Sequence, residues 1–177
     1  VLENAKHLFV GAPTASSERV KKSGSAFMYG LPLGNAGAPA NSRLDGEQVG
    51  ERYGHSLVAH NYGHKIAVGS PFYKRDKLAK VGRVEAMQFQ SSSIYRSAFK
   101  EFKGQHKGEQ FGLNLAAGYH TSDLLVGSPF SPSNDAKPLK KAGRLDIYPA
   151  WDSEDNKKTI YGDKANLQLG SSMLGID

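Results

Sequence analysis

The chain contains no cysteine. This absence excludes a disulfide framework, a thiolate metal site and a cysteine nucleophile, and it leaves the redox compartment open. Long hydrophobic runs are also missing, since a stretch such as Leu124–Val126 is far shorter than the roughly 20 apolar residues of a membrane-spanning helix. Phosphate-loop, dinucleotide and Gly-x-Ser-x-Gly signatures do not occur. The sequence therefore predicts no catalytic residue in this chain.

Turn-forming residues are abundant. The 177 residues include 20 glycines and 8 prolines, spread over many short clusters, whereas apolar residues make up 38% of the chain. Short runs of small and β-branched residues alternate with polar ones between these clusters, a pattern typical of strands. We therefore expect an all-β protein with little or no helix.

The same pattern of residues occurs three times at a spacing of 58 residues. Val-Gly-Ala/Ser-Pro recurs with its glycine at positions 11, 69 and 127. An aromatic or leucine residue followed by glycine recurs at Tyr53, Phe111 and Leu169, and further glycines keep the same spacing at positions 46, 104 and 162. Three independent markers with one period indicate an internal repeat.

The repeat units are expected to span roughly residues 1–46, 47–104 and 105–162, with residues 163–177 starting another. Each unit should hold four short strands. In the two complete units we expect them at 53–60, 65–71, 82–89 and 97–104, then at 111–118, 123–129, 143–149 and 158–163. Residues 94–100 are interpreted as a loop that leads into a strand. A β-sandwich would explain short strands but not the strict copying, whereas four-stranded propeller blades explain both.

Phe111-Gly112, the motif Asp123-Leu-Leu-Val-Gly-Ser-Pro129 and Gly143-Arg-Leu-Asp-Ile-Tyr148 follow one another in an order that resembles the FG-GAP repeat of integrin α-subunit propellers. The resemblance covers the whole chain. It implies about three blades of four antiparallel strands, as part of a larger, seven-bladed ring that other segments or another chain would complete. The chain begins in what should be a second strand and ends in what should be a first strand, which fits such a partial ring.

Within this class, residues 159–177 look most like blades of the C-terminal propeller of glycosylphosphatidylinositol-specific phospholipases D. That resemblance implies a secreted protein in which these blades are a non-catalytic binding and scaffold module. The phosphodiester of a lipid anchor would be hydrolysed in a separate domain that holds zinc. The alternative is an integrin α-like adhesion head that binds protein ligands.

Many FG-GAP blades carry a calcium loop with several aspartates between their first two strands. The corresponding segments here, 59–69 and 117–127, contain a single acid, Asp123. One carboxylate cannot supply six or more oxygen ligands. We therefore expect these two loops to bind no calcium and the chain to hold no metal or other cofactor.

Basic residues concentrate in the segments between the second and third strands of the units. Ten of the 23 lysines and arginines lie there, namely Arg19, Lys21, Lys22, Lys74, Arg75, Lys77, Lys80, Lys137, Lys140 and Lys141. Equivalent loops of a repeat emerge on one face, so their charges add. The hypothesis is a basic rim that binds an anionic lipid headgroup or a phosphorylated glycan. Basic hairpin tips that only protect strand edges and keep the protein soluble are the alternative. Nucleic acid is not expected as a partner, because no recognised nucleic-acid module appears.

Two other groups of polar residues are interpreted as solvated. His60 and His64 are four residues apart, but they flank a glycine turn and not a helix, so their spacing has no metal-binding meaning. With His120 they are expected to lie in loops exposed to solvent. The acidic segment 152–156 is expected to be an exposed hairpin tip.

Overall fold

The computed structural model describes residues 7–31, 39–60, 64–90, 93–95, 100–118 and 123–175. Within these ranges the regular structure consists of β-strands and turns, with no helix, and they form three antiparallel sheets. The expectation of an all-β chain is confirmed. No helix of the described residues is long and apolar enough to cross a membrane.

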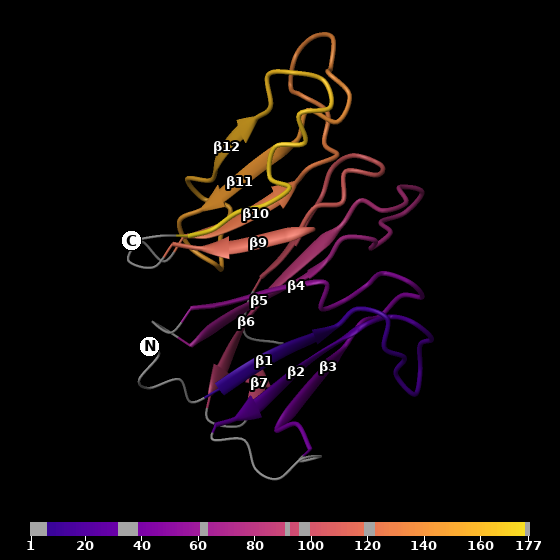
Figure 1. Cartoon of the computed structure of the whole chain (residues 1–177), viewed down its shortest axis with the longest axis vertical. Coiled ribbons are helices and arrows are strands. Elements are labelled where there is room, and N and C mark those ends of the chain that lie inside the picture. Colours follow the sequence, from indigo (N-terminus) through magenta and orange to yellow (C-terminus); the bar gives the residue numbers. More distant parts are fainter. Residues whose placement is uncertain are drawn as a thin grey trace.

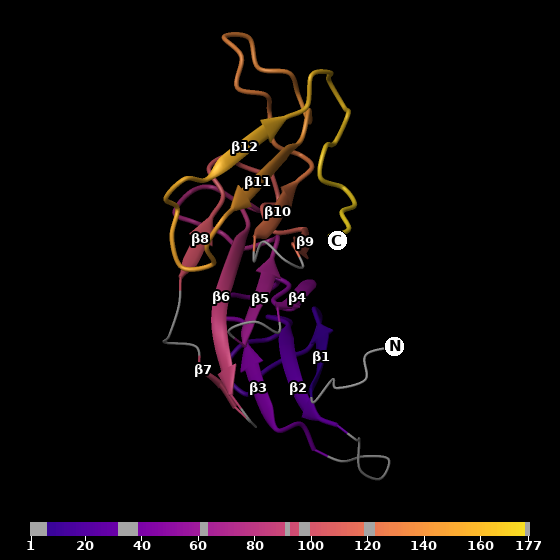
Figure 2. The same ribbon diagram turned by 90° about the vertical axis from the view of Figure 1, so that its left-hand side faces the viewer.

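The three sheets follow one another along the chain and along the long axis of the molecule (Figures 1 and 2). The first contains β1 (His7–Ala12), β2 (Ser25–Gly30) and β3 (Ser42–Asp45) in that order. The second contains β4 (Ser56–His60), β5 (Lys65–Ser70), β6 (Arg83–Gln90) and β7 (Ser93–Tyr95), while β8 (Glu101–Lys103) pairs with the first half of β6. The third contains β9 (Asn114–Ala117), β10 (Leu124–Ser128), β11 (Arg144–Tyr148) and β12 (Lys158–Tyr161).

Strand β5 shows why the middle sheet is apolar on both faces. Its side chains point alternately to opposite faces, as in any strand. Ile66 and Val68 pack into a cluster shared with the first sheet, whereas Ala67 packs into a cluster shared with the third. The run Ile-Ala-Val is therefore continuous because both faces are covered.

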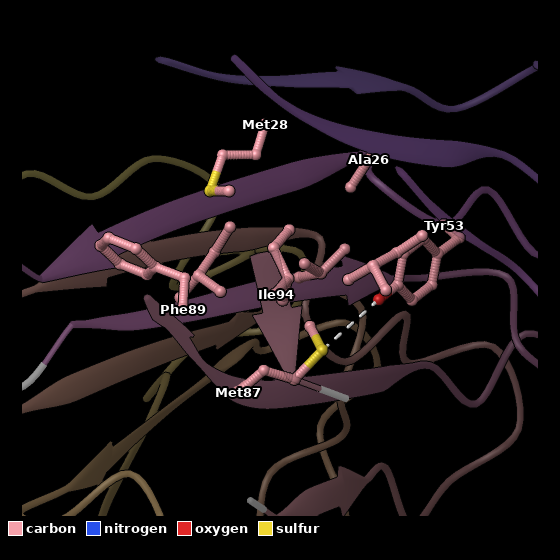
Figure 3. Close-up of a cluster of buried hydrophobic side chains, with 9 residues drawn as sticks. Ala26, Met28, Tyr53, Met87, Phe89 and Ile94 are labelled. Carbon is pink, nitrogen blue, oxygen red and sulfur yellow. Dashed lines mark hydrogen bonds between the residues drawn. The ribbon is translucent and has the colours of Figure 1, made fainter. Parts of the chain in front are cut away.

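The cluster between the first two sheets is shown in Figure 3. Met28 of β2 faces Phe89 of β6, and Tyr53, which lies just before β4, packs beside Met87. The second cluster includes Trp151, whose side chain is fully buried. Each pair of neighbouring sheets thus shares one hydrophobic core.

Pairs of glycines are in close contact where each sheet meets the segment that follows it. A Cβ atom on Gly11, Gly69 or Gly127 would collide with the carbonyl oxygen of a glycine in the following unit. These partner glycines are Gly54, Gly112 and Gly170. The separation within each pair is 43 residues every time, so the close approach requires both glycines and a fixed length of chain between them. This recurring contact keeps successive units in step with one another.

The segment around Ile94 differs from the prediction. Ser93–Tyr95 is not a loop but a strand, which pairs with the end of β6. Ile94 is buried in the first hydrophobic cluster, and its amide donates to the Ser42 hydroxyl of β3 at 3.4 Å. The strand forms because this isoleucine completes a core between two sheets, a contact 52 residues away in sequence. The predicted strand at 97–104 is limited to β8 in the described residues, since 97–99 lie outside them.

Two repeat-related serines, Ser70 and Ser128, have buried hydroxyl groups with no hydrogen-bond partner among the residues that the structure describes. The first unit has Ala12 at this position. Because an unsatisfied buried hydroxyl costs about 1–3 kcal/mol, Ser128→Ala is expected to raise the free energy of unfolding by about 1 kcal/mol. The measurement is the midpoint of urea unfolding at unchanged slope.

Ser25→Ala is the matched control for this substitution. Ser25 is equally buried, but its hydroxyl donates to the Asp45 carboxylate at 2.6 Å. That variant should lower the midpoint. Equal losses in both alanine variants would contradict the assignment of Ser128 as an unsatisfied group.

Candidate functional site

Three loops hold the ten basic residues that the sequence singles out. We call residues 13–24, 71–82 and 129–143 the basic loops; they join β1 to β2, β5 to β6 and β10 to β11. All ten side chains are exposed: Arg19, Lys21, Lys22, Lys74, Arg75, Lys77, Lys80, Lys137, Lys140 and Lys141. In Figure 1 the three loops lie along the right-hand and upper edge of the molecule. The structure therefore presents these charges at one edge of the sheets.

Each basic loop is held at both ends by backbone hydrogen bonds. The amide of the glycine that ends the loop donates back to a carbonyl near its start: Gly24 to Ala15 at 2.9 Å, Gly82 to Tyr73 at 3.3 Å and Gly143 to Ser131 at 3.0 Å. The last lysine of each loop has a left-handed backbone, and its carbonyl accepts from a backbone amide in the segment that follows the sheet. These lysines are Lys22, Lys80 and Lys141, with φ of 52°, 53° and 51°. Their positions are thus fixed by the segment that follows each sheet.

The positive charge of the chain resides in these loops. They contain ten basic residues and three acids, Glu18, Asp76 and Asp135, which gives +7. The remaining 13 basic residues and 14 acids give −1, and the whole chain has a net charge of +6. The Debye length at physiological ionic strength is about 8 Å, so neighbouring exposed charges within a loop reinforce one another. The basic loops form the one region of the described chain with a large excess of positive charge.

Aromatic rings lie beside the basic side chains in two of the loops. The Lys80 ammonium is 4.8 Å from the ring centroid of Phe72, and the Lys141 ammonium is 5.8 Å from that of Phe130. Contacts of this kind contribute about 0.5–1 kcal/mol at exposed sites. The first loop has Thr14 at the corresponding position and lacks the ring.

His60 does not lie in solvent, and the prediction that it does is wrong. It ends β4, is 5% exposed, and its ring centroid is 6.2 Å from that of Trp151. His64 is exposed, as predicted, with its ring edge against Phe89. His120 lies outside the described residues. Burial of His60 depends on a tryptophan 91 residues further along, which no local pattern indicates.

Buried charges, which the sequence reasoning missed, lie just inside the edge that carries the basic loops. Arg83 opens β6 and is 2% exposed. Its guanidinium contacts four carboxylates, those of Glu47, Glu51, Glu85 and Glu101, at 3.1 to 3.3 Å. Glu51 is fully buried in the segment that links the first sheet to the second. The pair therefore ties this linker to the middle sheet.

The surroundings of Arg83 and its carboxylate partners shift the pKa values of these side chains. Burial raises the pKa of Glu51, although the Arg83 charge opposes the change. Burial alone would lower the pKa of Arg83, but Glu85 and Glu51 outweigh it and raise that pKa above its ordinary value. For Glu101, burial is outweighed by hydrogen bonds from Lys103 and Arg83, which hold its pKa below the ordinary value. Since Tyr53 also donates to Glu85 at 2.9 Å, the carboxylates are engaged by fixed partners, and the cluster has a structural role.

The third sheet repeats this arrangement. Arg144 opens β11, is 2% exposed, and lies 3.3 Å from the fully buried Glu109 and 2.9 Å from Asp146. Glu51 and Glu109 are 58 residues apart, and both arginines directly follow the glycine that ends a basic loop. That recurrence is the signal from which the buried pairs could have been inferred.

The acidic segment and the predicted loops between the first and second strands are the remaining polar segments. Of the acidic segment 152–156, residues 152 and 154–156 are exposed, as predicted, and Ser153 is half-buried. Within the described residues there is no group of three histidines or acids placed to hold a metal ion. The two loops predicted to lack calcium lie partly outside the described residues, at 61–63 and 119–122. Their lack of calcium stays a prediction.

A scan of the chain against models of known protein families gave no match, and a search of curated proteins gave none either. What the structure defines is therefore the class: an all-β chain of three antiparallel sheets, joined through glycine contacts and bearing three basic loops at one edge.

Proposed function

We propose that this chain is a non-catalytic binding and scaffold module made of consecutive FG-GAP propeller blades, whose basic loops bind an anionic partner. The single observation that carries the proposal is the location of the charge. The whole positive excess of the chain lies in three exposed loops that occupy corresponding positions after β1, β5 and β10. Basic side chains that only kept the protein soluble would not need this concentration.

The blade interpretation is supported by the repeated junction. Each sheet joins its neighbour through the same glycine contacts, so further units can be added without changing the geometry. The first sheet has no strand that corresponds to β4 and β9 among the described residues. In the proposed ring, that strand and the remaining blades come from other parts of the protein or from another chain.

The proposed host is a secreted protein similar to glycosylphosphatidylinositol-specific phospholipase D, in which the blades bind the anionic region of a membrane or glycan near the substrate. An integrin α-like adhesion head is the alternative. The complete sequence of the host protein, read from its transcript, separates the two. A histidine-rich, helical zinc domain there supports the first, and uninterrupted further blades support the second.

Reversing two charges in every basic loop tests the binding role. The variant carries glutamate at Arg19, Lys21, Lys74, Lys77, Lys137 and Lys140, all exposed. Each basic residue near an anionic surface contributes about 1 kcal/mol, so we expect binding to vesicles that contain phosphatidylserine, or to a sulfated glycan, to weaken by at least about 100-fold. Sedimentation with vesicles and calorimetry measure the change.

A matched pair of double variants controls for net charge. Lys74→Glu with Lys77→Glu reverses two charges in the second loop, and Lys100→Glu with Lys158→Glu reverses two exposed charges outside the loops. Both take the formal net charge from +6 to +2. The proposal requires the first pair to weaken binding more than the second. Unchanged binding in the six-residue variant would end it.

A further inference from the structure

A groove of about 510 Å³ opens between the third basic loop and the segment that links the second sheet to the third. The polar and aromatic side chains that line it are His106, Lys107, Gln110, Phe130, Lys140 and Lys141. None of the described residues that line it is acidic. Its volume lies within the range of about 300–1,000 Å³ that is common for small-ligand sites.

The corresponding place at the junction between the first two sheets is closed. There the Gln48 side-chain amide donates to the Lys74 carbonyl and its oxygen accepts from the Lys74 amide, both at 2.9 Å. The Arg52 guanidinium lies 4.1 Å from the ring centroid of Phe72 and covers that ring. The junction is therefore filled by its own side chains.

Three differences open the groove at the second junction. Positions 58 residues further along hold His106 in place of Gln48, Pro132 in place of Lys74 and Gln110 in place of Arg52. Proline has no amide hydrogen, so the paired bonds cannot form, and Gln110 brings no planar cation to the ring. Phe130 lines the groove, and among the described residues the one cation over its ring is the Lys141 ammonium, 5.8 Å from the ring centroid.

We propose that this groove binds one acidic sugar unit of a glycan, with its sulfate, phosphate or carboxylate at the lysines and its apolar ring face on Phe130. Ammonium groups form strong charge-assisted hydrogen bonds to such anions. The aromatic side chain supplies apolar contact area for the C–H face of a sugar. A flat membrane surface cannot enter a concave groove, so a saccharide fits the shape better than lipid headgroups. The inference rests on the proposed function, because it assigns a ligand class to one of the basic loops.

Filling the groove with the side chains that fill the first junction tests the inference. The variant combines His106→Gln, Gln110→Arg and Pro132→Lys, which copies Gln48, Arg52 and Lys74 and raises the formal net charge by 2. A sulfated tetrasaccharide is titrated by calorimetry, and vesicles with phosphatidylserine are measured in parallel. We expect saccharide affinity to fall by at least about tenfold although the protein has become more positive, while vesicle binding stays equal or increases. If net charge alone determined binding, the affinity for the anionic saccharide would increase instead.

Two smaller variants keep the test decisive if the triple variant does not fold. Gln110→Arg places a guanidinium over Phe130 in the way Arg52 covers Phe72, and Phe130→Leu removes the flat ring at unchanged charge. Each variant should bind the tetrasaccharide more weakly than the parent does, and its melting temperature should be close to that of the parent. Unchanged saccharide affinity in these variants, or no binding by the parent at millimolar saccharide, overturns the groove assignment. If vesicles still bind to the parent in that case, the proposed function survives; if neither probe binds, both fail.

Discussion

Arg83→Met is expected to lower the free energy of unfolding by about 3–5 kcal/mol, as breaking a buried ion pair does. The arginine is 2% exposed and compensates the fully buried Glu51, whose carboxylate would otherwise lie in the junction without a countercharge. Urea unfolding at pH 7 measures the loss. Arg75→Met is the matched control, because Arg75 is exposed and lies 4.0 Å from Asp76, so its removal should cost less than about 1 kcal/mol.

The pH dependence of this loss identifies its cause. Burial raises the pKa of Glu51 in the folded protein, so folding takes up a proton between the ordinary value of 4.5 and the raised one, and the carboxyl favours folding less as the pH rises. Without Arg83 the charged form is even less favourable, and the pKa rises further. The difference in free energy of unfolding between the parent and Arg83→Met should therefore shrink as the pH falls from 7 toward 4.5. A deficit that stays constant would point to lost packing and not to an uncompensated carboxylate.

A second substitution in the same protein separates these causes. Glu51→Gln added to Arg83→Met removes the charge that the first change left unpaired. The double variant should be more stable than Arg83→Met alone by about 1 kcal/mol or more, which is a coupling typical of residues in contact. Strictly additive losses would show that the two side chains do not depend on one another.

The repeat, and with it the order of the strands, was predictable because it is set by backbone geometry. A glycine whose Cβ would collide with a neighbouring backbone allows no other residue, so Gly11, Gly69 and Gly127 appear in the sequence at fixed positions. The basic loops were predictable for a related reason. Each basic loop ends at a glycine of the repeated junction, so its place in the chain can be read from the repeat. Its exposed positions accept residues of any charge, and the excess of lysine there is therefore visible in the sequence.

The buried charges and His60 were not predictable in this way. Charged and imidazole side chains are rarely fully buried, so composition assigns them to the surface. Arg83 and Glu51 are inside because each is the other's partner, and His60 is buried because Trp151 covers it from the next sheet. The groove at Phe130 depends on three positions in two segments, and the sequence does not show that the side chains at the equivalent positions of the first junction bond to one another and fill it.

Gly82→Ala is expected to cost on the order of 4 kcal/mol or more, the range in which a single named mechanism is required. Gly82 has φ of +85°, and a Cβ there would overlap the backbone of Phe111, with which it forms a parallel β-bridge into the third sheet. Neither backbone can move without separating the two sheets. The measurement is the free energy of unfolding from urea titration.

Gly108→Ala isolates the contact from the backbone conformation. Gly108 has a similar φ of +78°, but a Cβ on it meets nothing within 4 Å. Alanine in the left-handed region costs roughly 1–2 kcal/mol, and this strain is common to both variants. The excess loss in Gly82→Ala therefore measures what the close approach between sheets contributes. Equal losses at the two glycines would mean that the sheets can separate slightly at no cost, and that the close approach of Gly82 to Phe111 does not stabilise the junction.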